Sequence, residues 1–317
     1  MKISQSEKYL GEDLGGSLSE SISRTISRRL GRATQSIYEI KGIVDDCRTE
    51  ISGGIMTGIV IFETAVIPFL LNNSSCWFSM KKSDLERLNR FQNRFLSNLL
   101  KVQKSPSCSL HWEFTMLKME NRILKAKLLL RHHLETLPES AVAHQVLQMQ
   151  KKQGLPTLCS ETDHFLREHN ISDINKYTKL QWKKFVGNLI AEENKNQLLS
   201  EMSQCKKIYN TEIMCESYEV KSYLKDMKPY FARVNYRERY SMLEFCKLNF
   251  PSQPEYLRQG FKCDFCSAIS SQKHLIYHCP EYDQFRKDRN MEDDAVKVQF
   301  LVDIIKYRQE QDQVSAD

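Results

Sequence analysis

The residues whose types and spacing point most directly to chemistry lie within FKCDFCSAISSQKHLIYHCPEY at 261–282. They are Cys263, Cys266, His274 and Cys279, in the pattern C-x2-C-x7-H-x4-C. Thiolates and imidazole nitrogens are the ligands of structural zinc sites, which use four donors in a tetrahedron. A C-x2-C pair can close a turn whose sulfurs converge, and the step from His274 to Cys279 can present both to one ion. The sequence therefore predicts a zinc module. A reduced hairpin without metal is the alternative, and His278 is a competing ligand.

The other cysteines carry no comparable pattern. The chain has ten cysteines in 317 residues, and the seven outside the cluster are scattered, which we interpret as free thiols and small core residues. The opening residues MKISQSEKYLGEDLGG contain no apolar stretch typical of a signal peptide. We therefore expect a reducing compartment, nuclear or cytoplasmic, in which clustered cysteines bind metal and do not form disulfides.

Composition and apolar periodicity predict a mainly α-helical fold. The chain is 41% hydrophobic and 27% charged, and its eleven glycines and eight prolines are few, which favours helices. Apolar residues recur at helical spacing in several segments. We predict helices at 18–44, 83–101, 116–134, 177–205, 213–227 and 294–311. Breaks are expected at KKQGLP, 151–156, and at PSQPEYLRQG, 251–260.

The helix predicted at 83–101 combines an apolar stripe with a basic face. Ser83 and Glu86 have the spacing of a capping box at its start. The basic face consists of Arg87, Arg90, Arg94 and Lys101. Over 81–131, twelve Lys and Arg residues stand against four Asp and Glu, so the segment carries a net charge of +8 against +6 for the whole chain. Such a surface suits a polyanion, because each neutralised phosphate releases counterions. A solvated helix face is the alternative.

The longest apolar run, IMTGIVIFETAVIPFLL at 55–71, requires a choice between a membrane span and a core helix. Its 17 residues are at the lower limit for crossing a bilayer, and Glu63 inside the run is costly in hydrocarbon. We expect a helix buried on most sides, and no membrane partner.

A pair of aspartates at 45–46, in GIVDDC, invites comparison with polymerases of the reverse-transcriptase type. Their aromatic-x-Asp-Asp tetrad binds two magnesium ions that align the reacting oxygens. Here Ile43 stands where the aromatic residue would be, and the pair ends a helical pattern where a β-hairpin is required. We interpret Asp45 and Asp46 as a solvated helix end.

Several segments, taken in order, carry a family resemblance. They are KYLG at 8–11, VIPFLLNNSSCW at 66–77, the stretch from LERLNRF to KMENRI at 85–123, RYSMLEFCKLNF at 239–250, and the Cys/His module. In this order they resemble the C-terminal part of the reverse transcriptase of non-LTR, LINE-type retrotransposons of the jockey-like kind. Asn72 and Asn73 replace the Tyr-Gly of that pattern. The fingers and the palm with the polymerase aspartates have no counterpart, and neither has the N-terminal endonuclease.

The resemblance implies an organisation and a role. It implies a thumb-like helical domain at 1–150 with 8–11 as a remnant of the palm edge, a helical connector at 151–260, a CCHC zinc module at 261–290 and a C-terminal helix at 291–317. The chain would be a truncated, non-catalytic fragment of an RNA-directed DNA polymerase that clasps template–primer. Its phosphate contacts would be Arg87, Arg90, Arg94, Lys101 and Lys104. The implied partners are RNA, an RNA–DNA hybrid or the DNA backbone, and a polymerase palm in trans.

Two other functions remain open from the sequence. An interaction protein or structural remnant would pack its helices against a partner and use zinc only to stabilise its tail. An enzyme would act through Asp45 and Asp46, or in trans with a palm. Phosphate binding weakens steeply as salt rises, whereas an apolar helix interface does not, so salt dependence separates the first alternative from nucleic-acid binding.

Overall fold

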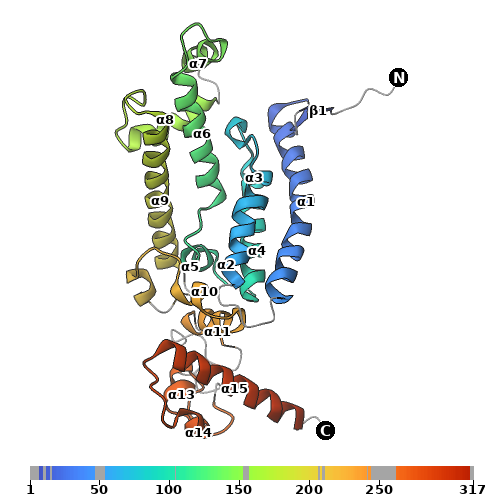
Figure 1. Ribbon diagram of the computed structural model, residues 1–317, viewed down its shortest axis with the longest axis vertical. Coiled ribbons are helices and arrows are strands. Elements are labelled where there is room, and N and C mark those ends of the chain that lie inside the picture. Colours follow the sequence, from blue (N-terminus) through green and yellow to red (C-terminus); the bar gives the residue numbers. More distant parts are fainter. Residues whose placement is uncertain are drawn as a thin grey trace, which may run out of the picture.

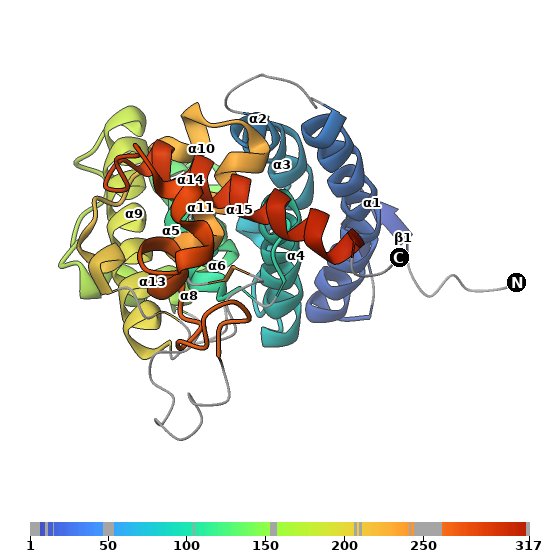
Figure 2. The same ribbon diagram turned by 90° about the horizontal axis from the view of Figure 1, so that it is seen from below.

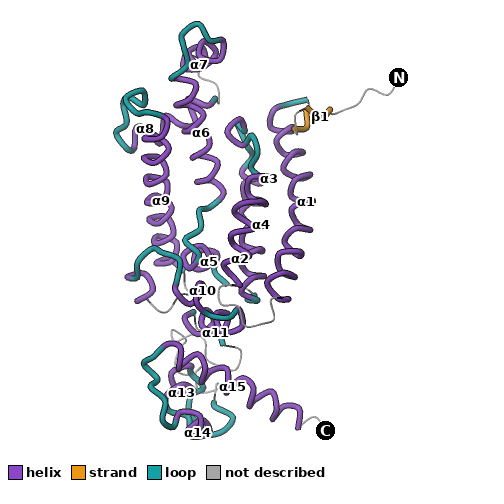
Figure 3. The backbone as a smooth tube through the Cα atoms, viewed as in Figure 1, coloured by secondary structure: helices purple, strands orange, loops and turns teal. Residues whose placement is uncertain are grey.

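The computed structural model describes residues 7–9, 12–14, 16–46, 54–103, 105–152, 157–205, 208, 211–240, 242–243 and 262–314. In these residues the fold is mainly α-helical, as predicted, and the sheet is a two-stranded hairpin (Figures 1 and 3). Long helices form the body of the molecule, and a smaller group of helices lies at one end, next to α11 (Figure 1).

The N-terminal hairpin is anchored on the first helix. Strands β1 (Glu7–Tyr9) and β2 (Glu12–Leu14) pair antiparallel, and helix α1 (Leu18–Asp46) follows them. Arg29 of α1 is buried and donates to the Glu12 carboxylate and to the carbonyl of Asn72. This guanidinium therefore ties the hairpin, α1 and the end of the next helix together.

The apolar run at 55–71 forms a nearly continuous helix. It comprises α2 (Gly54–Ile61), a π-helical turn (Phe62–Val66) and α3 (Ile67–Leu70). A Cβ atom on Gly58 would lie 2.9 Å from Val44 and 3.0 Å from Leu99, so glycine permits the close approach of α2 to α1 and α4. The prediction of burial on most sides was wrong, because only one side packs against these helices, and Val60 and Phe69 are exposed on the other. Among the described helices, none is long and apolar enough to cross a membrane.

Helix α4 (Lys82–Leu100) confirms the predicted apolar stripe, since Leu88, Phe91, Phe95 and Leu99 are buried. The predicted capping box was wrong. The helix begins at Lys82 and its N-cap, Lys81, makes no side-chain cap bond. The first turn is held by a tertiary contact in its place, because the buried Asp84 carboxylate accepts from Ser23 Oγ on α1.

The following helices build a second group beside the first. They are α5 (Ser107–Glu113), α6 (Met119–Glu135), α7 (Val142–Lys152), α8 (Leu158–Glu168), α9 (Lys179–Gln204), α10 (Ser222–Asp226) and α11 (Pro229–Arg239). Helix α9 packs along α6, and Leu128 of α6 shares an apolar core with Trp182 of α9. Residues on either side of the break expected at 151–156 thus contribute to one core. Residues 153–156 of that break lie outside the described residues.

A buried carboxylate on α5 gathers the segments that follow α9. Glu113 is fully buried and accepts bonds of 2.7 Å from the hydroxyls of Tyr223 and Tyr240. Arg239 donates to the same carboxylate and to that of Glu216. Burial together with the Glu113 charge holds the pKa of both tyrosines well above the ordinary range, so both remain donors. The single helix predicted at 213–227 was wrong, because the chain bends between Glu216 and Tyr223 to bring both to this centre.

The C-terminal module packs on α11. It contains α13 (Gln272–Tyr277), α14 (Asp283–Arg286) and the predicted last helix, α15 (Asp294–Val314), which crosses α11 (Figure 2). Val234 of α11 joins Leu275, Phe300 and Leu301 in one buried cluster. The module is therefore continuous in packing with the helical body.

We expect Glu113→Ala to lower the free energy of unfolding by about 3–5 kcal/mol, because it leaves the Arg239 guanidinium half-buried without its innermost partner. Urea denaturation followed by far-UV circular dichroism measures the change. Glu216→Ala is the matched control. This second carboxylate is about one-third exposed, so its removal should lower the free energy of unfolding by less. Equal losses in the two variants would contradict a central role for Glu113.

Candidate metal centre and basic helix face

The four cysteine and histidine side chains predicted as ligands converge at one point. One ligand atom from each of Cys263, Cys266, His274 and Cys279 lies within 4.8 Å of all the others. Cys263 Sγ and Cys279 Sγ are 3.7 Å apart, and Cys266 Sγ and His274 Nε2 are 3.2 Å apart. Around a tetrahedral ion with metal–sulfur bonds of about 2.3 Å, two sulfurs lie about 3.8 Å apart. The cluster can therefore hold one metal ion.

A short hairpin positions the first two cysteines. Lys262 and Ile269 form an antiparallel bridge, and the Cys263 N–H donates to the Ala268 carbonyl at 2.7 Å. Ser267 has a φ of 61°, in the left-handed region, which reverses the chain directly after Cys266. The C-x2-C spacing thus gives the turn whose sulfurs converge, as the sequence predicted.

Helix α13 supplies the other pair. The Ser271 side chain caps its start by accepting from the His274 N–H at 3.1 Å. At the helix end the N–H groups of His278 and Cys279 both donate to the His274 carbonyl at 2.8 Å, which turns Cys279 back toward the cluster. His278, the competing ligand, is exposed and lies outside the cluster.

The four side chains differ in how readily each reaches the protonation state that a metal ligand requires. Burial opposes ionisation of the Cys263 thiol, but hydrogen bonds from the backbone N–H groups of Phe265 and Cys266 and from the Cys279 and Cys266 thiols together outweigh it and lower its pKa. Burial and the neighbouring Cys263 raise the pKa of Cys279 to about 12. Burial also lowers the pKa of His274, so this ring is neutral at pH 7, as a metal ligand must be.

Arg286 supports the cluster from outside, which the sequence did not reveal. Its guanidinium donates to the Cys279 carbonyl and, at 3.3 Å, to the carbonyls of Leu275 and Ile276. It also lies 6.0 Å from the ring centre of Phe300 on α15. One guanidinium thus fixes the end of α13, the backbone of a ligand and the position of α15.

The predicted basic face lies on α4 along its seam with α1. Arg87 bonds to Asp84 and to Ser27, and Lys101 pairs with Asp45 at 3.1 Å. Arg94 is exposed and donates to the Tyr38 hydroxyl at 2.6 Å, with its guanidinium over the tyrosine ring. Arg90 is exposed, and its Nε donates to a carbonyl in the preceding turn. Lys104 lies outside the described residues.

Most of the remaining cations counted in 81–131 are paired with carboxylates. Four of these cations lie on or beside α6. These pairs are Lys118 with Glu201, Arg122 with Glu63, Lys127 with Glu161, and Arg131 with Glu135 and Asp163. The net +8 of the segment is thus largely neutralised on its α6 half, and the exposed positive charge is concentrated on α4.

The Asp45 side chain forms two ion pairs that connect helices. Its carboxylate pairs with Lys101 and, at 2.7 Å, with Arg233 of α11, which also donates to the Leu99 carbonyl. Burial works against ionisation, but these two cations outweigh it and lower the pKa of Asp45. The residue therefore links the ends of α1 and α4 to α11.

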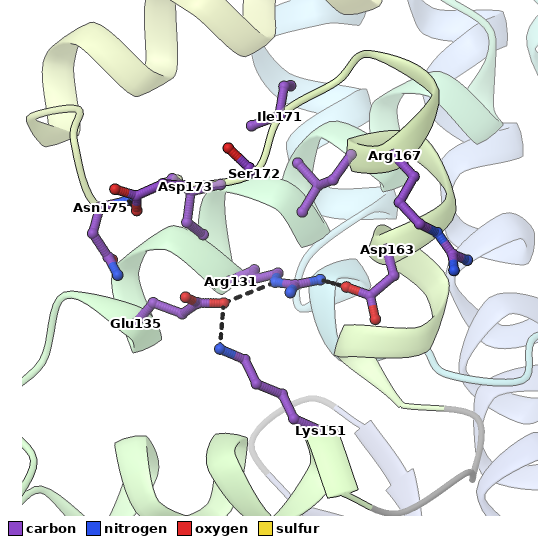
Figure 4. A pocket seen from close by; sticks show the side chains of 11 residues that line it. Arg131, Glu135, Lys151, Asp163, Arg167, Ile171, Ser172, Asp173 and Asn175 are labelled. Carbon is purple, nitrogen blue, oxygen red and sulfur yellow. Dashed lines mark hydrogen bonds and ion pairs between the residues drawn. The ribbon is translucent and has the colours of Figure 1, made fainter.

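A cavity of about 450 Å³ lies between α6, α7 and α8 (Figure 4). Its lining contains three cations, Arg131, Lys151 and Arg167, and three carboxylates, Glu135, Asp163 and Asp173. Glu135 binds both Arg131 and Lys151, and Asp163 binds Arg131 (Figure 4). The balanced charge gives this cavity no preference for an anion.

Comparisons with protein-family models, with curated proteins and with solved structures each find no match to this chain. The resemblance to the non-LTR reverse transcriptases therefore remains a prediction from the order of sequence segments.

We expect Cys279→Ser to reduce bound metal from about one ion per chain to nearly none, because the cluster loses one of four donors. Native mass spectrometry of the purified protein measures the stoichiometry. Cys215→Ser is the matched control, since this free thiol is exposed and lies outside the cluster. Retention of a full equivalent by Cys279→Ser would contradict the assigned ligand set.

We expect Arg286→Gln to keep the metal but weaken its affinity by roughly tenfold or more, as loss of an outer-shell partner commonly does. Competition with a chromophoric chelator measures the dissociation constant. Lys287→Gln removes the adjacent exposed charge and serves as the control. An unchanged affinity in Arg286→Gln would show that the guanidinium only packs against α15.

Proposed function

We propose that this protein is a non-catalytic nucleic-acid-binding protein whose α4 face contacts the phosphate backbone and whose C-terminal module is stabilised by zinc. We assign it no catalysis of its own. The proposal has two parts, one for the metal and one for the basic face, and each rests on its own observation.

Zinc is the ion that best suits the Cys/His cluster. Three thiolates and one imidazole form a closed four-donor set, which is typical of structural zinc sites. Soft thiolate ligands in a tetrahedral arrangement disfavour magnesium and calcium, which prefer oxygen donors. Cys263 and Cys279 belong to the same apolar cluster as Val298 and Leu301 of α15, so a bound ion would hold the core of the module together.

The observation that carries nucleic-acid binding is the pair Arg90 and Arg94. Both side chains are exposed on successive turns of α4, and in the described residues no carboxylate pairs with either. Arg94 is oriented by a hydroxyl, that of Tyr38, and not by a carboxylate, so its charge is available to a phosphate. Arg90 and Arg94 lie about 6 Å apart along the helix axis. Arg87 and Lys101 continue the row but are paired with Asp84 and Asp45.

The resemblance gives this surface a specific context. A thumb of a non-LTR reverse transcriptase would clasp an RNA–DNA hybrid through such a helix. The chain would then act as the thumb and tail of such a polymerase, with a palm in trans as a partner. The alternative is that the chain is an interaction or structural protein in which zinc only holds the tail. The packing of the cluster against α15 favours that alternative for the module itself.

We expect Arg90→Glu combined with Arg94→Glu to weaken binding of a fluorescein-labelled RNA–DNA hybrid by at least tenfold, because two phosphate contacts become repulsive. Fluorescence anisotropy at 50 and 200 mM salt measures the effect, and binding by the unaltered protein should fall at least tenfold across this range. Both residues lie off the apolar stripe, so unfolding should be unaffected.

Lys225→Glu combined with Lys228→Glu is the matched control, since it reverses two exposed charges that are not on α4. An equal loss in this control would indicate that only net charge matters. Absence of hybrid binding by the unaltered protein at 50 mM salt would refute the proposed function and favour the interaction protein.

A further inference from the structure

A second surface with binding character lies on the N-terminal half of α9, away from α4 and from the metal cluster (Figure 1). It is a groove of about 470 Å³. The groove, here called the α9 groove, is lined by Lys176, Tyr177, Gln181, Lys184, Phe185 and Asn188.

The local sequence explains why these side chains share one face. Thr178 and Gln181 form a reciprocal capping box that fixes the start of α9. From Gln181 the lining residues Lys184, Phe185 and Asn188 follow at steps of three, one and three, so they lie on one side of the helix. The side-chain oxygen of Gln181 accepts from the Thr178 N–H and the Thr178 hydroxyl. The side-chain NH2 group of Gln181 is therefore the part that can donate to a ligand.

Two aromatic rings form a rigid apolar surface in the α9 groove. Tyr177 and Phe185 stack with ring centres 5.0 Å apart and planes inclined by 17°. Both rings are half-buried and pack on Trp182. Trp182 is itself buried and donates to the Leu128 carbonyl at 3.0 Å. The rings are therefore held in place before any ligand arrives, which reduces the entropy lost on binding.

The charge of the groove is positive and uncompensated. Two exposed lysines, Lys176 and Lys184, line it, and the Lys176 ammonium lies 5.1 Å from the centre of the Tyr177 ring. No carboxylate lines the groove, and in the described part of the chain no ion pair engages either lysine. This distinguishes it from the cavity beside Arg131, where Arg131 and Lys151 are paired with carboxylates (Figure 4).

We propose that the α9 groove binds single-stranded nucleic acid, with an unpaired base on the Tyr177 and Phe185 rings and the flanking phosphates on the lysines. Aromatic faces accept any base, and a positive rim tracks the backbone, which is the usual composition of single-strand sites. The exposed amides of Gln181 and Asn188 can donate to a base edge. The inference goes beyond backbone binding by α4, because it concerns another surface and an unstacked strand, and it does not require the α4 face to function.

The test uses the full-length protein and a fluorescein-labelled 12-nucleotide single-stranded RNA in an anisotropy titration. We expect Tyr177→Leu to weaken binding by about tenfold, because it keeps apolar volume but removes one stacking face. Lys176→Gln combined with Lys184→Gln should also weaken binding, and more so at 50 mM salt than at 200 mM. Both lysines are exposed, so this second variant should fold normally.

Matched controls separate the outcomes. Tyr230→Leu alters another exposed tyrosine, and Lys225→Gln combined with Lys228→Gln removes two exposed lysine charges elsewhere. Losses confined to the groove variants support the inference, even if Arg90→Glu with Arg94→Glu leaves hybrid binding unchanged. Equal losses in groove and control variants would overturn it, as would loss on removing the lysines with none in Tyr177→Leu. Tighter binding of a 12-residue poly-glutamate peptide than of RNA would also overturn it, in favour of an acidic protein partner.

Discussion

The burial of one carboxylate, Glu113, constrains the centre of the molecule. A charge removed from water must be paired, and an isolated one would cost several kcal/mol. The partners come from separate segments, since Tyr223 lies on α10 while Arg239 and Tyr240 end α11. Satisfying this single group therefore requires the chain after α9 to bend back and to place α11 across the end of the helical body.

Helix α11, placed in this way, contacts both the helical body and the C-terminal module. Toward the helical body, Arg233 binds Asp45 and the Leu99 carbonyl, which joins the ends of α1 and α4. Toward the C-terminal module, Val234 enters the buried cluster, and Glu238 pairs with Lys297 of α15. Burial raises the pKa of Glu238, so this pair is a sheltered contact. The metal cluster and the basic helix are thus connected through one short helix, although they lie far apart in the sequence.

A feature could be predicted from the sequence when it depends on residues close together in the chain, and not when it depends on contacts between distant segments. The mainly α-helical fold and the convergence of Cys263 and Cys279 depend on local periodicity and turn geometry, and both were predictable. The capping box at Ser83 was not decided locally, because Asp84 of the same turn instead binds Ser23, sixty-one positions away. Helices α7 and α8 were also missed. Each is only eleven residues long, and although α8 places Phe165 and Leu166 in the core around Trp182, α7 buries Leu147 alone.

The same difference in range explains which cations remain available to a ligand. A count over 81–131 treats every lysine and arginine alike, but Glu63 and Glu201 lie outside that window and neutralise Arg122 and Lys118. A surface attracts a polyanion when its cations are not paired with carboxylates of the same chain, not when their local number is high. Arg90 on α4 and Lys184 in the α9 groove meet this condition, whereas the charged cavity beside α6 does not. Long-range pairing within the chain, more than local composition, therefore decides where this protein can present positive charge to a partner.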